Sequence, residues 1–437
     1  MLSRHDSEAI EAARRSLGRQ LAALRQAAGY SQQEFAPLTG YGRSTLANVE
    51  TGRQNVARNF WQRCAQALAA ETLVTGYDQI EAMAETARRD AQQRIQADRD
   101  ARVETWRQAG LDAGSKVPAA AVSDEHERLA YALAHPASAD LVTVALLREQ
   151  IRGIDLQYDR LPSTALIADT GQCLGQIGFL SAHARRPDVR HDLRSAESEA
   201  ATLMGQLVWD ASQRRDHDTA LSYFGQAARA ARSRADPAAE SLALLRTGMV
   251  ALYGRKDPRA GLVLCEQAAA TAGTASRVLG GLAVLHAAEA HAMLGDRASC
   301  EQALGNADQQ FAGVRQEDPA IDLYSPAQRG RLAGSCYLFL DDARRAAPIL
   351  EDTARQYQDH SKSEAIVLGN LALARIRQGE LDGAVASVHQ AIDVIELTWG
   401  GGGLNVVFTA TLELRRWQQS TPVRDLQDRV LTLMTAG

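Results

Sequence analysis

An eight-residue stretch near the N-terminus, RSTLANVE from Arg43 to Glu50, carries the side chains whose types and spacing best fit a defined chemistry. In a helix, its outward face would hold Arg43, Ser44 and Asn48. A guanidinium can bond to O6 and N7 of guanine, and an asparagine amide can bond to N6 and N7 of adenine. Because Arg43 lies near the start of the helix and Asn48 follows five residues later, both can reach one groove. The stretch therefore predicts contacts with base edges in the major groove of DNA.

The residues before this stretch have the pattern of two helices that would position it. Leucines recur at helical spacing up to Gly29, which is expected to end the first helix. Ser31, followed three residues later by Glu34, forms a capping box that begins a second helix. Gln32 lies at the start of that helix, where its amide and nearby backbone N–H groups can hold a phosphate. Gly40 is expected to make the tight turn into the third helix.

The third helix and a fourth one complete the expected domain. The third would run from about Gly42 to Glu50, with Leu46 and Val49 facing inward. The fourth would begin at about Arg58 and pack four residues against the other helices: Phe60, Trp61, Ala65 and Leu68.

This segment resembles the lambda-repressor-like (XRE) helix-turn-helix family over about 55 residues. The resemblance is carried by Arg25, the turn from Gly29 to Gln32, Gly40, the helix Arg43–Glu50 and Gly52. It implies base contacts from the positions of Arg43, Ser44 and Asn48. It also implies contacts with phosphates or the minor groove from a second set of positions: Gln32, Arg53, Asn55 and Arg58. A structural ion pair between Arg25 and Glu50 is implied as well.

Two residues depart from the family pattern. Pro37 falls late in the second helix, where it removes a backbone donor and is expected to shorten or bend that helix. Gly42 stands where the family prefers a serine or threonine cap, so the third helix is expected to begin less firmly. The alternative to DNA binding is a small helical bundle whose arginines are incidental.

Composition and charge place this domain in a larger, all-α chain. The chain has 437 residues, of which only 5% are aromatic, and its length predicts two to four domains or one domain with a repeat array. Residues 1–75 hold nine basic residues against six acidic ones, whereas the rest holds 39 against 47. A basic N-terminal segment on an acidic remainder suits a protein that contacts phosphate at one end.

The sequence contains no recognisable metal-binding or catalytic motif. The five cysteines form no CxxC pair, and the histidine pairs lack the i,i+4 spacing of a helical metal site. No phosphate-binding glycine loop or nucleophile motif is present, so we expect no metal, no cofactor and no enzymatic activity. No apolar stretch approaches ~18 residues and no signal peptide opens the chain, so we expect a cytoplasmic protein that does not insert into a membrane.

Residues 77–122 are expected to connect the N-terminal domain, residues 1–76, to the remainder. Within 78–108, helix formers carry a thin apolar stripe at helical spacing: Ile80, Met83, Ala87, Ala91 and Ile95. We expect a solvated connector helix here, with a coiled-coil dimer seam as the alternative. Residues 109–122 are the expected hinge.

Residues 123–437 are expected to form an α-solenoid, because one phrase repeats in them. An acidic residue is followed four positions later by a small one and seven positions after that by another small one. The acidic residues are Asp216, Asp257, Asp296, Asp342 and Glu380, at spacings of 41, 39, 46 and 38 residues. Each acid would cap the second helix of a pair, and the small residues would let neighbouring helices approach. Residues 125–214 hold further helices without the clean phrase.

The phrase resembles the tetratricopeptide repeat, most clearly in Leu371–Ala372, Gly379–Leu381, Ala384 and Ala391–Ile392. That resemblance places Asn370 in a groove that grips a peptide, although a surface asparagine without a partner is the alternative. Four glycines at 400–403 are expected to break the helices, with a final helix from about Val406 inside a C-terminal cap, residues 404–437.

These features together predict a transcriptional regulator that resembles actinobacterial XRE-family proteins with tetratricopeptide bodies. We expect a homodimer on a palindromic operator in double-stranded DNA, and a peptide, small molecule or protein as ligand of the solenoid groove. The alternatives are an interaction scaffold whose DNA binding is secondary and an antitoxin or defence-type repressor.

Overall fold

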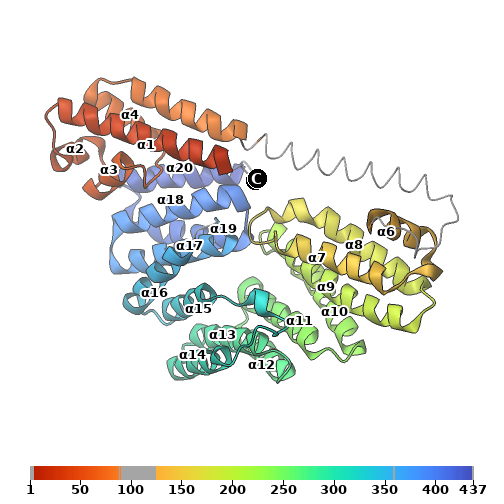
Figure 1. Ribbon diagram of the computed structural model, residues 1–437. Helices are drawn as coiled ribbons and strands as arrows, with labels where there is room; N and C mark the ends of the chain where they lie inside the picture. The colour runs from red at the N-terminus through yellow and green to blue at the C-terminus, as the bar shows by residue number, and fades with distance from the viewer. Residues whose placement is uncertain (1–3, 88, 90–124, 358–359, 436–437) are drawn as a thin grey trace. The chain divides into compact units, whose positions relative to one another are not determined.

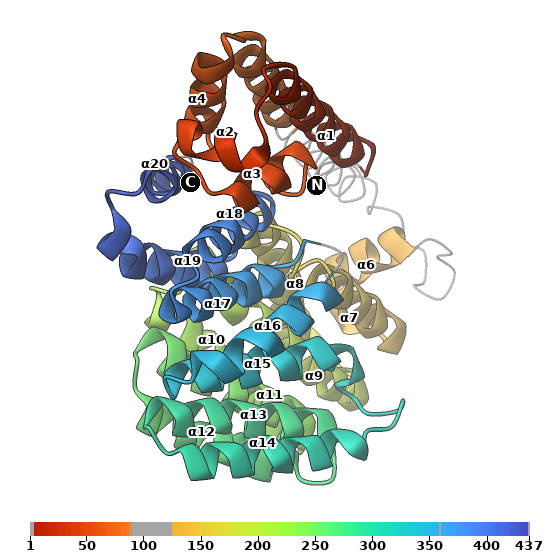
Figure 2. The same cartoon turned by 90° about the vertical axis from the view of Figure 1, so that its left-hand side faces the viewer.

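The computed structural model describes residues 4–87, 89, 125–357 and 360–435, and the secondary structure within them is helical, with no strand (Figures 1 and 2). The all-α class expected from the composition is confirmed. Most of the expected connector, including Ala91, Ile95 and the hinge at 109–122, lies outside the described residues.

Five helices form the N-terminal domain. They are α1 (Arg4–Ala27), α2 (Gln32–Thr39), α3 (Arg43–Glu50), α4 (Arg58–Leu68) and a fifth helix at residues 72–87. One fully buried side chain from each helix meets in a common core: Leu21, Phe35, Leu46, Phe60 and Leu73. The ring of Tyr41, in the turn between α2 and α3, packs edge-on against Phe60 with centroids 4.9 Å apart. This core holds α3 at a fixed place in the domain.

The helix ends in this domain follow the expected signals. Ser31 accepts a hydrogen bond from the backbone N–H of Glu34, whose carboxylate accepts one from the backbone of Ser31. Gly40 ends α2 with φ at 75°, a left-handed conformation that favours glycine. Pro37 lies inside α2, which ends two residues later and spans eight residues in all. The capping box, the glycine turn and the bounds of α3 are thus confirmed.

The start of the expected connector belongs to the core of the N-terminal domain. Ile80, Ala84 and Ala87 are buried in the same apolar cluster as the five core side chains. Met83, which the expected stripe includes, is instead 46% exposed. The helix at 72–87 is therefore packed on the domain up to Ala87 rather than solvated all round.

Residues 125–357 form a solenoid of helix pairs. The helices are α6 (Glu125–Ala134), α7 (Leu141–Asp155), α8 (Ser163–His183), α9 (Pro187–Ala211), α10 (His217–Ser233), α11 (Pro237–Met249), α12 (Pro258–Ala272), α13 (Arg277–Met293), α14 (Arg297–Ala312), α15 (Pro326–Phe339) and α16 (Ala343–Gln356). From α9 on they pack as consecutive pairs, of which Figure 2 shows α13 with α14 and α15 with α16. The first helices of successive pairs also touch, α11 against α13 and α13 against α15.

The repeated acidic phrase marks the second helix of each pair, as expected. Asp216, Asp257, Asp296 and Asp342 are the N-caps of α10, α12, α14 and α16, and each carboxylate accepts the backbone N–H three residues on. The small residues that follow are buried, and Gly261 shows why size matters there. A Cβ at that position would lie 2.3 Å from the Leu252 side chain.

The C-terminal helices correct the expectation for the glycine run. They are α17 (Lys362–Gln378), α18 (Leu381–Thr398), α19 (Gly401–Glu413) and α20 (Thr421–Thr435). Helix α19 begins at Gly401, not near Val406, so the break lies at residues 399–400 and three glycines form the first turn of α19. Close packing explains them, since a Cβ on Gly401 would lie 2.7 Å from the backbone oxygen of Asp210.

Packing divides the chain into two compact units. The first combines the N-terminal domain with residues 360–397 and the C-terminal segment from Gly403, and the second holds the helices from α6 to α16. This division cuts across the expected solenoid domain 123–437, because its last helices group with the N-terminal domain.

Candidate nucleic-acid interface

The three expected base-contacting residues of α3 differ in their exposure to solvent. Arg43, the first residue of the helix, and Ser44 are exposed, whereas Asn48 is half-buried. The Asn48 amide lies 3.5 Å from the side-chain oxygen of Gln54, in the segment that follows α3. Arg43 is therefore the side chain most open to a base, and Asn48 must turn away from Gln54 to pair with one.

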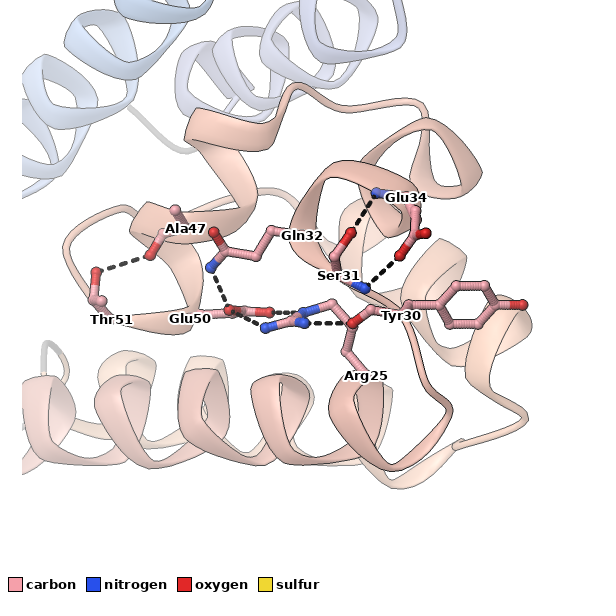
Figure 3. Close-up of polar contacts among 8 residues, drawn as sticks. All are labelled: Arg25, Tyr30, Ser31, Gln32, Glu34, Ala47, Glu50 and Thr51. Atoms are coloured by element: carbon pink, nitrogen blue, oxygen red, sulfur yellow. Dashed lines mark hydrogen bonds and ion pairs between the residues drawn. The ribbon is translucent and has the colours of Figure 1, made fainter.

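A buried ion pair fixes the other end of α3 to α1 (Figure 3). The Arg25 Nε and Nη2 atoms donate to the two Glu50 carboxylate oxygens at 2.6 and 2.9 Å. Arg25 also donates to the backbone oxygen of Tyr30 at 2.6 Å. Both charged side chains are 6% exposed. The ion pair implied by the family resemblance is present, and Arg25 is a structural residue here.

Gln32 lies at the start of α2 as expected, but its side chain faces the same ion pair. Its amide Nε2 donates to Glu50 Oε2 at 2.7 Å (Figure 3). A phosphate contact from that amide requires it to leave Glu50. The phosphate role of Gln32 stays a prediction.

The remaining expected phosphate contacts lie after α3. Arg53 is exposed, and the Asn55 side-chain oxygen accepts the backbone N–H of Val56 at 3.1 Å. Arg58, the first residue of α4, binds both Asp78 carboxylate oxygens at 2.7 Å, and this pairing raises the pKa of Arg58. Asp78 therefore competes with a phosphate for Arg58, although both side chains are about half exposed.

A carboxylate from α18 contacts the N-terminus of α3, which the sequence alone did not indicate. The Ser44 hydroxyl donates to Asp382 Oδ2 at 3.1 Å. Gly42 is the N-cap of α3 and makes no side-chain cap bond. A Cβ at Gly42 would lie 2.2 Å from the same Asp382 oxygen, so a serine or threonine cap would require the Asp382 carboxylate to move.

Two further hydrogen bonds join the N-terminal domain to the C-terminal helices. Asn59 donates to Asp425 Oδ1 at 2.6 Å, and Arg63 donates to the Thr421 hydroxyl at 3.2 Å. Asp425 is 2% exposed, and burial, with a smaller effect from the charge of Asp428, raises its pKa from 3.8 to about 7. The sequence carried no signal for these contacts, because their partners lie more than 350 positions apart.

The other expected sites lie outside the helix-turn-helix domain. Asn370 is 7% exposed in α17, and its assignment to a ligand groove stays a prediction. Among the described residues, no group of three or more His, Cys, Asp or Glu side chains is arranged to hold a metal ion. No helix in the described part of the chain is long and apolar enough to span a bilayer.

The short helices α2 and α3 are joined by a glycine turn, and both pack on the five-helix core. Residues 16–74 match the family described as the helix-turn-helix domain. The N-terminal domain is a helix-turn-helix domain. The match spans the second half of α1 and all of α2, α3 and α4, and so includes each expected DNA-contacting residue. No curated protein shows a significant match to the chain.

Proposed function

We propose that the protein is a sequence-specific transcriptional regulator of the XRE type, in which α3 is the recognition helix. The observation that carries this proposal is a helix-turn-helix domain in which Arg43 and Ser44 are exposed at the start of α3. Arginine at that place can read guanine, and the buried Arg25–Glu50 pair holds α3 in a fixed position against α1. This role requires the protein to share a compartment with chromosomal DNA.

The contact with Asp382 gives the regulator a closed form. DNA and Asp382 compete for the same hydroxyl of Ser44 and for the positive end of the α3 dipole. A carboxylate there also repels an approaching phosphate. DNA binding by α3 therefore requires the C-terminal helices to release the helix-turn-helix domain, and ligands that favour release act as inducers of binding.

Further elements of the proposal concern assembly. One helix-turn-helix domain reads a half-site, so we expect a homodimer on a palindrome with half-sites about 34–36 Å apart. The helix pairs resemble tetratricopeptide repeats, which bind peptides, small molecules or partner proteins, and that similarity supports a sensing role for the solenoid. An interaction scaffold and an antitoxin or defence-type repressor remain the competing functions.

Selection of DNA from random duplex pools tests this function. The full chain is incubated with the pool at fixed salt, and the retained DNA is sequenced. We expect a palindromic consensus that the Arg43→Ala/Asn48→Ala double variant fails to enrich. Retention without a consensus, equal for the wild type and the double variant, would support the scaffold and reject the regulator.

A further inference from the structure

A small cavity inside the helix-turn-helix domain is lined by three polar side chains, each of which has a buried donor without a partner. They are Arg14 of α1, Gln54 in the segment after α3 and Trp61 of α4. Arg14 Nε, Gln54 Nε2 and Trp61 Nε1 are all buried and have no hydrogen-bond partner among the described residues. Buried N–H groups in folded proteins nearly always have a partner, either a protein group or an ordered water. The cavity is therefore the place where an acceptor for these donors belongs.

Packing around the cavity holds these donors in place. Trp61 is 5% exposed and Gln54 is 7% exposed, so neither side chain can turn its donor to bulk water without leaving the core. The Trp61 ring packs edge-on against Phe60, with centroids 5.4 Å apart, and stacks on Tyr77 with centroids 6.4 Å apart. Because the walls are part of the domain core, the donors keep their positions whether or not DNA is bound.

Size and charge decide which acceptor fits the cavity. Its volume is about 10 Å³, which is close to the smallest space that accommodates one water molecule. The Glu81 carboxylate lies 3.9 Å from Arg14 Nη2, so an anion in the cavity would place a second negative charge beside the same guanidinium. A water molecule accepts hydrogen bonds without adding charge. Tyr77 and Asn55, whose side chains offer acceptor oxygens for the hydrogens of a water, also line the cavity.

Gln54 connects this cavity to α3. Its Nε2 is one of the donors without a partner, and its side-chain oxygen lies 3.5 Å from Asn48 Nδ2. Asn48 is one of the residues expected to contact a base. An acceptor for Gln54 Nε2 fixes the plane of the amide, and with it the oxygen that Asn48 contacts. The occupant of the cavity therefore acts on the orientation of Asn48.

We propose that the cavity binds one water molecule, which accepts hydrogen bonds from the buried donors and holds Gln54 in the orientation that contacts Asn48. Buried waters typically make about three hydrogen bonds to polar groups that would otherwise lack a partner. Gln54 is then a positioning residue, which keeps the Asn48 amide turned towards the domain until DNA competes for it. The water site is independent of the proposed function, whereas the effect on Asn48 rests on it.

Nuclear magnetic resonance of the full chain tests the water site. With isotope-labelled tryptophan, the five tryptophans give indole N–H signals, and Trp61→Phe identifies the signal of Trp61. We expect the Trp61 N–H to show a direct Overhauser cross-peak with water, which Gln54→Met weakens or abolishes. Gln20→Met is the matched control, because Gln20 is an exposed glutamine of the same domain that donates to Thr72 at 3.3 Å.

Three results would overturn the water site. They are a wild type without the cross-peak, equal cross-peaks in Gln54→Met and Gln20→Met, and a saturable shift of the Trp61 signal when chloride replaces gluconate at constant ionic strength. The last result would show that the cavity binds an anion instead of water.

A double-variant cycle tests the effect of Gln54 on Asn48. Gln54→Met removes the contact with Asn48, so the Kd for the selected operator is expected to fall by about two- to tenfold. In an Asn48→Ala background the same substitution should leave the Kd unchanged. Weaker binding by Gln54→Met, or an equal effect in both backgrounds, would overturn the positioning role of Gln54. If the chain selects no operator, the proposed function fails, while the magnetic resonance result decides the water site by itself.

Discussion

At the scale of single residues, the helix-turn-helix domain depends on two side chains that do not touch DNA in the proposed complex. Arg25 and Glu50 are both buried, and Glu50 also accepts the Gln32 amide. Removing one partner of such a pair leaves the other charge buried without compensation.

Arg25→Met is expected to destabilise α3 against opening by about 3–5 kcal/mol. Hydrogen exchange of the full chain, followed by mass spectrometry over residues 43–50, measures this directly. Arg58→Met is the control, because it removes a pair with Asp78 that is exposed and screened by water. Equal protection of residues 43–50 in the two variants would contradict the structural role of Arg25.

Substitution of Gly42 is expected to strengthen DNA binding. In Gly42→Ser the new side chain overlaps Asp382 in the closed form, and once the domain is released it can cap α3. Both effects favour the open form, so operator affinity is expected to rise by about three- to tenfold. Competition binding at fixed salt measures the change. A loss of affinity, with α3 still protected from hydrogen exchange, would show that Asp382 does not oppose DNA binding.

At the scale of elements, the local signals of the sequence predict most of the helices. The Ser31 capping box, the Gly40 turn and the four repeated aspartate caps depend on neighbours within a few positions, and each is present. The predicted start of the last helices near Val406 is wrong because glycine disfavours a helix by propensity alone. Here Gly401 lies too close to Asp210 for any side chain, and its backbone N–H donates to the Asp210 carboxylate at 2.9 Å. The contact between Ser44 and Asp382 joins residues 338 positions apart, and no periodic pattern in the sequence predicts it.

The aspartate caps of the solenoid yield a prediction for a whole helix. Asp257→Ala removes the acceptor for the Ala260 backbone N–H at the start of α12 and is expected to cost about 1 kcal/mol. Hydrogen exchange over the first turn of α12 should increase, while the exposed neighbour substitution Arg259→Ala should leave it unchanged. Unaltered exchange in Asp257→Ala would mean that packing alone sets the start of α12.

At the scale of the whole molecule, the closed form is expected to depend on pH through Asp425. Its pKa is about 7 when Asn59 is bound, and exposure to water on release returns it towards 3.8. Protonated Asp425 stabilises the closed form, because its pKa is higher there than in the open form. This stabilisation decreases as pH rises from about 4 to 7 and is absent above 7. Acidification from pH 7 to pH 5 therefore strengthens closure.

Operator affinity of the wild type is accordingly expected to fall by up to about tenfold per pH unit between pH 7 and pH 5, relative to Asp425→Asn. The asparagine variant does not titrate and keeps an oxygen for the Asn59 amide, so it corrects for the pH dependence of DNA binding itself. Parallel pH profiles for the two proteins would exclude Asp425 from the closed form.

The central claim is that α3 reads DNA and that Asp382 covers its N-terminus. The most direct test measures the Kd for the selected operator, at one salt concentration, of the wild type, Asp382→Ala and the Arg43→Ala/Asn48→Ala double variant. The account predicts binding about three- to tenfold tighter for Asp382→Ala, because the carboxylate no longer competes for the N-terminus of α3. It predicts binding at least about tenfold weaker for the double variant, since each contact of a side chain with a base contributes roughly 1–3 kcal/mol. Wild-type affinity in the double variant would contradict the assignment of α3 as the recognition helix.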